Sequence, residues 1–193
     1  MTRRLAFVLE VDPDDFARLA QENGWTPVDA GAEQDESSDE DRPERRWQVP
    51  GGEVRFVDDT VVEVQYVDIS AEPSAPIEET IDAELRAYDK ETCLQVLDLS
   101  KPEATVSHAL RLLATTAPGD FDQRVFDATA SALQDEREKV RYWALKIANY
   151  TEWTQFLPEV SRLASSDPSQ TVRTFATNSK LLLEAIGRIP RGQ

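Results

Sequence analysis

The sequence contains a single cysteine, Cys93, and a single histidine, His108. One cysteine cannot form an internal disulfide, which favours a reducing compartment, and we expect the cytoplasm. The two residues also supply too few ligands for a zinc site, and no second histidine or cysteine is present to build a catalytic cluster. We therefore predict that His108 is a structural or surface residue and that Cys93, beside Leu94 and Leu97, is a small core residue.

Glycine is scarce as well, with seven in the chain. No glycine-rich loop of the kind that cradles phosphate is present, and no serine sits in a nucleophile-elbow context. The sequence therefore predicts no enzyme activity, no catalytic residues, no metal site and no cofactor.

Long apolar runs are also missing. The N-terminal stretch "MTRRLAFVLEVDPDD" has two arginines and then apolar residues, but Glu10 and Asp12 interrupt it too early for the apolar core of a signal peptide. No stretch approaches the length of a membrane span. We expect a soluble, cytoplasmic chain with no membrane partner.

Basic residues are outnumbered: 21 lysines and arginines stand against 37 aspartates and glutamates, a formal net charge of −16. Residues 1–75 carry 19 acidic and 7 basic residues, so most of the excess lies there. Such a surface repels phosphate backbones and attracts basic partners. We therefore do not expect the chain to bind nucleic acid. A solubility adaptation is the alternative, since arginine outnumbers lysine 16 to 5.

The N-terminal part has the pattern of a small α/β unit. Residues 3–11 are apolar and β-branched, as in a buried strand, and residues 12–24 predict a short helix capped by Asp12, started by Pro13 and ended by Gly24. Residues 46–70 predict a strand meander with hairpin turns at Gly51-Gly52 and Asp58-Asp59, one face of which stays in water. Between them, residues 29–45 are acidic and predict a mobile loop that lacks the ligand alternation of an EF-hand. Two prolines in residues 70–76 mark a linker, so the acidic domain spans 1–72.

From residue 77 onward the apolar spacing is helical, and it repeats. "VRYWALKIANY" at 140–150 is matched by "VRTFATNSKLL" at 172–182 after a shift of 32 residues, and the shift also places Asp135 on Asp167. An isolated amphipathic helix repeats every 3.6 residues, whereas a period of 30–50 residues indicates stacked two-helix units. The units read as helices at 121–134 and 137–150, then at 154–165 and 168–187. A fainter copy has helices at 77–98 and 102–115.

This pattern resembles HEAT-repeat proteins over residues 77–187, with armadillo-like and other helical-hairpin arrays as alternatives. In the HEAT family, aspartate and arginine at the matching positions form a ladder that joins successive turns. The resemblance therefore implies such a ladder from Asp135, Arg141, Asp167 and Arg173. It also implies that the second helix of each unit lines a concave face. The stripes of Val140, Trp143, Ala144, Ile147 and Tyr150, and of Val172, Phe175, Ala176 and Leu183, are then buried by stacking.

The predicted fold is therefore α+β: a small N-terminal α/β domain with one helix and three to four mostly antiparallel strands, followed by an α-α superhelix of about three HEAT-like hairpins at 77–193. On the predicted concave face we expect partner-binding residues. They are Tyr142, Lys146, Asn149, Arg173, Thr174 and Asn178. Trp153 is expected to wedge between repeats, and ordinary solvated polar faces are the alternative for the others.

The best interpretation of the whole chain is a non-catalytic adaptor that binds another protein, one with a basic surface, through this face, the acidic domain or both. One alternative is an immunity-like or antitoxin-like protein that neutralises a basic nuclease toxin. Another is a lyase-like or hydroxylase-like HEAT protein, for which one histidine and one cysteine leave few ligands. The oligomeric state and the partner stay open.

Overall fold

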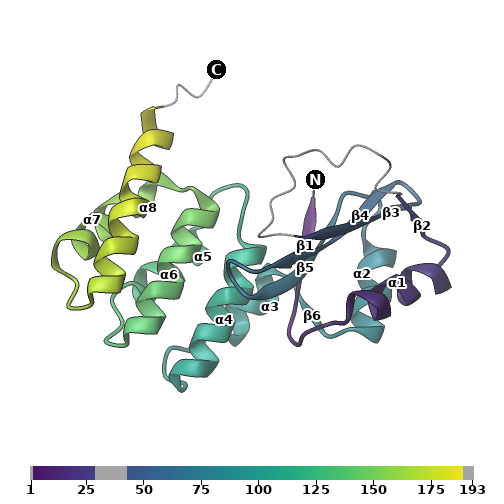
Figure 1. Cartoon of the computed structure of the whole chain (residues 1–193), viewed down its shortest axis with the longest axis horizontal. Coiled ribbons are helices and arrows are strands. Elements are labelled where there is room, and N and C mark those ends of the chain that lie inside the picture. Colours follow the sequence, from purple (N-terminus) through teal and green to yellow (C-terminus); the bar gives the residue numbers. More distant parts are fainter. Residues whose placement is uncertain (1, 29–42, 189–193) are drawn as a thin grey trace. The chain divides into compact units, whose positions relative to one another are not determined.

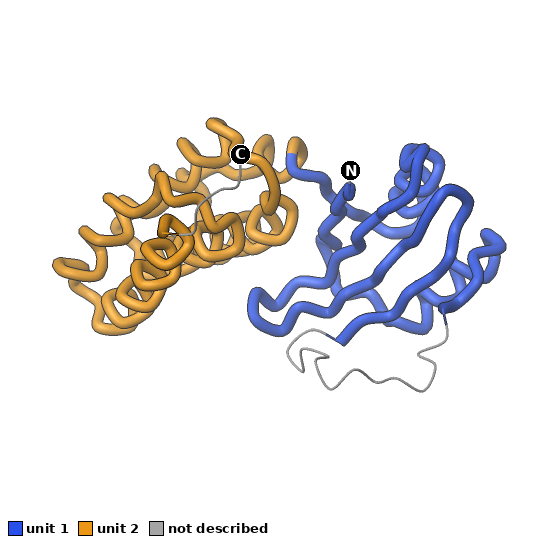
Figure 2. The backbone as a smooth tube through the Cα atoms, turned by 90° about the horizontal axis from the view of Figure 1, so that it is seen from above, with its two compact units in different colours: residues 1–90 blue, residues 91–193 orange. Residues whose placement is uncertain are grey.

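The computed structural model describes residues 2–28 and 43–188 of the chain, which forms two compact units, residues 1–90 and residues 91–193 (Figure 2). Unit 1 holds an antiparallel sheet with two helices, and unit 2 is helical (Figure 1). The fold class is α+β, as the sequence predicts. The predicted mobile loop at 29–45 lies outside the described residues, apart from its last three residues. Of these, Glu44 and Arg45 already belong to a strand.

The sheet of unit 1 is larger than the sequence predicts. Within the described residues it contains six strands in the order β2-β3-β4-β5-β1-β6, and every neighbouring pair is antiparallel. The strands are β1 (Arg3–Phe7), β2 (Thr26–Pro27), β3 (Glu44–Val49), β4 (Gly52–Asp59), β5 (Val64–Ile69) and β6 (Ala87–Tyr88). The two short strands, β2 and β6, extend the predicted meander at both edges.

Two helices pack on one face of this sheet, α1 (Pro13–Glu22) and α2 (Ala75–Glu84) (Figure 1). The predicted capping of α1 is confirmed: the Asp12 carboxylate accepts the N–H of Asp14 at 2.9 Å, and Pro13 occupies the first turn. Phe16 is fully buried and lies 5.0 Å, between ring centroids, from Phe56 of β4. Because strand residues alternate between faces, residues such as Arg4 and Arg55, next to core residues in sequence, point away from the helices.

The first hairpin turn differs from the prediction by one residue. Val49 pairs with Gly52, so the turn residues are Pro50 and Gly51, and Gly52 belongs to β4. Gly51 has a φ of +83°, which is a conformation that favours glycine. Gly52 is needed for another reason, since a Cβ there would lie 2.1 Å from the carbonyl oxygen of Ser70. In the second turn β4 extends through Asp59, whose carboxylate accepts the N–H groups of Val61 and Val62.

The prediction of a single helix at 77–98 is wrong. The chain instead forms α2, then the strand β6, and then α3 (Lys90–Val96). Ile77 and Ile81 of α2 are buried in the core of unit 1, and Ala87 of β6 pairs with Phe7 of β1. The free edge of β1 offers backbone hydrogen bonds that a continuous helix could not use. As a result, unit 1 extends to residue 90, beyond the boundary at 72 that the prolines predict.

Unit 2 contains the remaining helices. They are α4 (Glu103–Thr116), α5 (Gln123–Ala132), α6 (Glu138–Thr151), the 3₁₀ turn η1 (Thr154–Phe156), α7 (Leu157–Ser166) and α8 (Gln170–Arg188). Their bounds lie within a few residues of the predicted segments from 102 to 187. Helix α6 packs between α4 and α8, while α5 contacts α6 and α7 contacts α8 (Figure 1). No described helix has the length and apolar character that crossing a membrane requires.

Aromatic rings of α5 and η1, and of the residues just before each, pack against one another. Trp153 is buried, its indole N–H donates to the carbonyl oxygen of Gly119 at 3.0 Å, and its ring lies 5.0 Å from that of Phe121. Phe126 of α5 stacks on Phe156 at 4.8 Å. These contacts join residues from two successive predicted hairpins.

Candidate functional site

The six predicted partner-binding residues lie on two helices that pack side by side. Tyr142, Lys146 and Asn149 belong to α6, and Arg173, Thr174 and Asn178 belong to α8. Helix α6 packs against both α4 and α8, and its buried residues include Val140, Ala144 and Ile147. We call the surface formed by Tyr142, Trp143, Lys146 and Phe175 the aromatic cluster.

The aromatic cluster has a lysine at its centre. The rings of Tyr142 and Phe175 lie 5.0 Å apart, and both are half-buried. Lys146 Nζ is 4.9 Å from the Phe175 ring centroid and 5.6 Å from that of Tyr142. Lys146 is only 9% exposed, which differs from the exposed polar position expected for it. The ammonium therefore stabilises the two rings through its attraction to their π faces.

The same arrangement occurs one helix earlier. Arg111 of α4 lies over the ring of Trp143, with Cζ 5.4 Å from the centroid, and Trp143 in turn contacts Tyr142 edge-on at 5.4 Å. Trp143 and Phe175 are the residues that the 32-residue shift superimposes. In both cases the cationic side chain comes from the preceding helix of the series α4, α6 and α8: Arg111 lies over Trp143, and Lys146 lies over Phe175.

The other predicted residues do not join the aromatic cluster. Arg173 donates to the carbonyl oxygens of Asp167 and Pro168 in its own turn. Thr174 and Asn178 are exposed on α8, and Thr174 accepts a hydrogen bond from Gln170. Asn149 is half-buried, and within the described part of the chain no hydrogen bond reaches its buried Oδ1.

Asp135 and Asp167 lie in the turns that precede α6 and α8, and Arg141 and Arg173 lie in the first turns of these helices. Arg141 donates from Nε to Asp167 Oδ2 at 2.6 Å and from Nη2 to Oδ1 at 2.9 Å, and both side chains are almost fully buried. Its Nη1 reaches the carbonyl oxygens of Asp135 and Glu136, both at 2.8 Å. This forked ion pair connects the start of α6 to the start of α8.

The two aspartates have matching local geometry and different arginine partners. Each accepts the backbone N–H two residues later, Asp135 from Arg137 at 2.9 Å and Asp167 from Ser169 at 2.8 Å. The Asp135 carboxylate pairs with Arg137, and this hydrogen bond is the main cause of its lowered pKa. Burial raises the pKa of Asp167, but the hydrogen bonds from Arg141 and Ser169 outweigh it, so the pKa is lowered overall. Both carboxylates are therefore held in the charged form.

A second charged site lies in unit 1, where the sequence predicts none. Asp68 of β5 is almost fully buried and pairs with Arg4 of β1 and Arg55 of β4. Arg55 also pairs with Glu44, which in turn pairs with Arg46. These residues lie on the sheet face opposite α1 and α2, and we call them the arginine row. Ordinary strand residues give no local signal for such a site, because only the strand order brings them together.

The single cysteine and the single histidine belong to α3 and α4. Cys93 is buried, and His108 Nδ1 lies 3.5 Å from Arg111 Nη2. Over residues 2–28 and 43–188, no group of three or more histidine, cysteine, aspartate or glutamate side chains is arranged to hold a metal ion.

Comparison of the chain with protein families, with curated proteins and with solved structures found no match. The HEAT resemblance therefore rests on the residues of the chain itself, and the geometry of unit 2 is the basis for any assignment of function.

Proposed function

We propose that the protein is a non-catalytic, cytoplasmic adaptor that binds a partner protein at the aromatic cluster of unit 2. In this proposal α6 and α8 are the second helices of two HEAT-like hairpins, α4 packs beside α6, and the layer that these three helices share is the binding face. The supporting observation is the half-exposed Tyr142–Phe175 pair, held by a lysine that is itself buried.

The physical argument is preorganisation. Aromatic side chains have few rotatable bonds, so they offer a large contact area at a small cost in conformational entropy. Lys146 beneath the rings restricts them further, because leaving this position would separate a buried ammonium from its π partners. Thr174 and Asn178, exposed on α8, supply polar groups at the rim of such a site.

The test combines affinity capture from an extract of the source organism with two variants. Tyr142→Ala removes one ring, and Asn178→Arg places a bulky cation at the exposed rim. Gln134→Arg, at an exposed position after α5, is the matched control for the added charge. We expect a protein captured by the wild type and by Gln134→Arg, and lost with both cluster variants.

The captured protein is then purified and its binding measured by calorimetry. Removal of a central interface aromatic is expected to weaken binding by at least about tenfold, since such residues contribute upwards of about 2 kcal/mol. A partner that binds Tyr142→Ala and Asn178→Arg as tightly as the wild type would place the interface elsewhere.

A second candidate function is an immunity-like role of unit 1, in which its carboxylates occupy the phosphate site of a basic nuclease. It is favoured by exposed acidic residues on both helices of the unit, namely Asp14, Asp15, Glu22, Glu79, Asp82 and Glu84. The gene neighbourhood gives the test: a basic toxin encoded beside this chain and inhibited by it at low salt supports the role. The absence of both the neighbouring toxin gene and the inhibition would exclude this role.

A further inference from the structure

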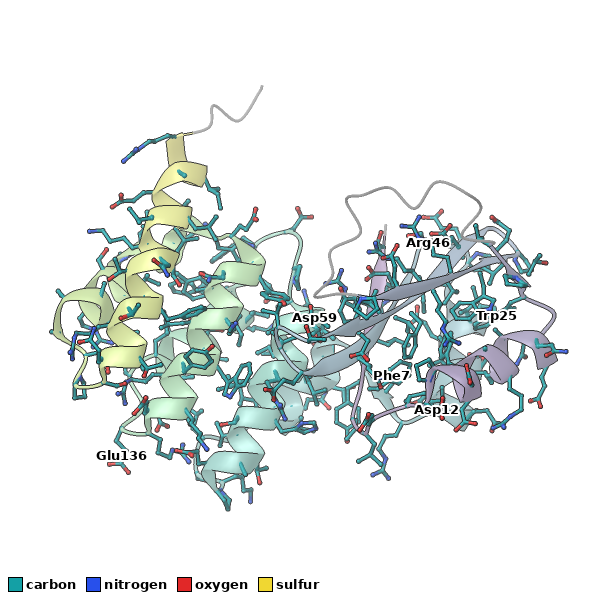
Figure 3. The ribbon with its side chains drawn as sticks, in the orientation of Figure 1. Phe7, Asp12, Trp25, Arg46, Asp59 and Glu136 are labelled. Atoms are coloured by element: carbon teal, nitrogen blue, oxygen red, sulfur yellow. The ribbon has the colours of Figure 1, made fainter. Side chains whose placement is uncertain are left out.

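The arginine row crosses four strands at one level of the unit 1 sheet. Arg4 of β1 pairs in register with Asp68 of β5, Asp68 with Arg55 of β4, and Arg55 with Arg46 of β3. Neighbouring strands lie about 4.8 Å apart, so these side chains stand next to one another. Figure 3 shows Arg46 on the side of the sheet away from α1, whereas Phe7 and Trp25 lie on the helix side.

The two halves of the row are held differently. On one side, Arg4 Nε donates to Asp68 Oδ1 at 2.5 Å and Nη2 donates to Oδ2 at 3.1 Å, while Arg55 Nη2 also donates to Oδ2. The Asp68 side chain is only 5% exposed, so it is a fixed counter-ion for these two guanidiniums. Burial lowers the pKa of Arg55, but the hydrogen bond and the charge of Asp68 outweigh it, so the pKa is raised overall.

On the other side, Arg55 and Arg46 face each other, and like charges in directly opposed strand positions repel. Glu44, two residues before Arg46 on the same face, relieves this repulsion. Its Oε1 accepts from Arg46 Nε at 2.7 Å, and its Oε2 accepts from Arg55 Nη1 at 3.1 Å. Glu44 is 29% and Arg46 is 48% exposed, so this carboxylate is accessible to exchange whereas Asp68 is not.

A hollow of about 370 Å³ opens over the row. Its lining is almost entirely polar, and besides the three arginines and Asp68 it contains Thr2, Glu53 and Ser70. Sites for small organic ligands are mostly apolar, so this lining fits a polar group presented by a larger molecule better. The lining residues carry three positive and two negative formal charges, an excess of one positive charge. Glu44 lies outside the lining and balances this excess through its pairs with Arg46 and Arg55.

We propose that the edge of this hollow between Arg46 and Arg55 binds a side-chain carboxylate of an acidic peptide segment, which displaces Glu44 from these two arginines. Without a ligand, the Glu44 carboxylate occupies this position, and its two oxygens show where the carboxylate of the ligand binds. One negative charge restores neutrality to the lining, and guanidinium forks match the planar carboxylate. The site belongs to unit 1 alone and does not depend on the adaptor function proposed for unit 2.

The test is a titration of the full chain at about 0.1 M salt, followed through backbone amide chemical shifts, because salt screens the repulsion between an anionic peptide and the net charge of −15 on unit 1. The probe is acetyl-Gly-Glu-Gly-amide, and acetyl-Gly-Gln-Gly-amide is its uncharged match. We expect the glutamate peptide to shift the amides around Arg46 and Arg55, and the glutamine peptide to leave them unchanged. Arg46→Gln is expected to weaken binding about tenfold, the effect of one charge-assisted hydrogen bond.

We predict the opposite effect on peptide affinity for Glu44→Gln. This substitution should tighten binding at least about threefold, because it releases the two guanidiniums. Glu79→Gln, an exposed position on α2, makes the same change in net charge away from the site and should alter affinity less than about twofold. Equal effects of the two substitutions, or equal binding of the two peptides, would overturn the proposal. Tighter binding of inorganic phosphate than of the glutamate peptide would overturn the choice of carboxylate as the ligand.

Discussion

At the scale of single residues, the loss of either partner of the Arg141–Asp167 pair leaves a buried charge in unit 2. Removing one partner of a buried ion pair costs about 3 kcal/mol, and we predict this loss in unfolding free energy for Asp167→Ala. Glu159→Ala, which breaks the more exposed pair with Arg162, should cost less than about 1 kcal/mol. Native-state hydrogen exchange at amides of α6 and α8 measures both, since two units need not unfold in one step. Similar losses for the two variants would contradict the assignment.

The same aspartate gives unit 2 a defined response to acid. The pKa of Asp167 is lowered by folding, so its charged form stabilises the folded state above its unfolded pKa of about 3.9. That stabilisation is lost as the pH falls below 3.9 toward the folded pKa, and Asp135 acts in the same direction. We predict that the opening free energy of α8 is nearly constant between about pH 7 and pH 5 and decreases below about pH 4. In Asp167→Asn the decrease should be shallower, and an unchanged slope would show that other carboxylates cause it.

At the scale of secondary-structure elements, α2 and β6 decide where unit 1 ends. A chain of residues 1–72, the domain that the prolines predict, lacks Ile77 and Ile81 and leaves the edge of β1 unpaired. Each isoleucine contributes about 1.5–3 kcal/mol through burial, a large part of the stability of a small domain. We therefore predict that residues 1–72 give no cooperative thermal transition by circular dichroism, whereas residues 1–90 do. Cooperative unfolding of the shorter chain would return the boundary to residue 72.

These elements also show which parts of the structure the sequence could predict. The start of α1 depends on Asp12 and Pro13, and α6 and α8 on apolar spacing, so signals within a few residues were sufficient. The strand β6 could not be predicted, because its partner β1 lies at the other end of the unit in sequence. The arginine row was missed for the same reason: its members are neighbours only through the strand order β3-β4-β5-β1. Lys146, predicted as an exposed binding residue, is buried, since its ammonium lies over rings from two helices, those of Tyr142 and Phe175.

At the scale of the whole molecule, nearly all of the excess charge belongs to one unit. Residues 1–90 carry 24 acidic and 9 basic residues, a net charge of −15, and residues 91–193 carry 13 and 12, a net charge of −1. Like charges repel in the compact state, and salt screens this repulsion. Raising the salt concentration from about 0.01 M to 0.1 M shortens the screening length from about 30 Å to about 10 Å. The two units should therefore respond differently to salt.

We predict that this change raises the opening free energy of β5 amides and leaves that of α6 amides nearly unchanged, as measured by hydrogen exchange in one sample. Salt also weakens the attraction in exposed ion pairs such as Arg45–Asp14, but each of these contributes less than about 1 kcal/mol. The pairs of Asp68 are partly buried and are screened less, so they do not offset the gain. Repulsion among the many carboxylates of unit 1 should then dominate, and α6 serves as the internal control. A decrease in the opening free energy of β5 amides would mean that local ion pairs determine the stability of unit 1. The negative charge of its acidic residues would then be neutralised by individual basic neighbours.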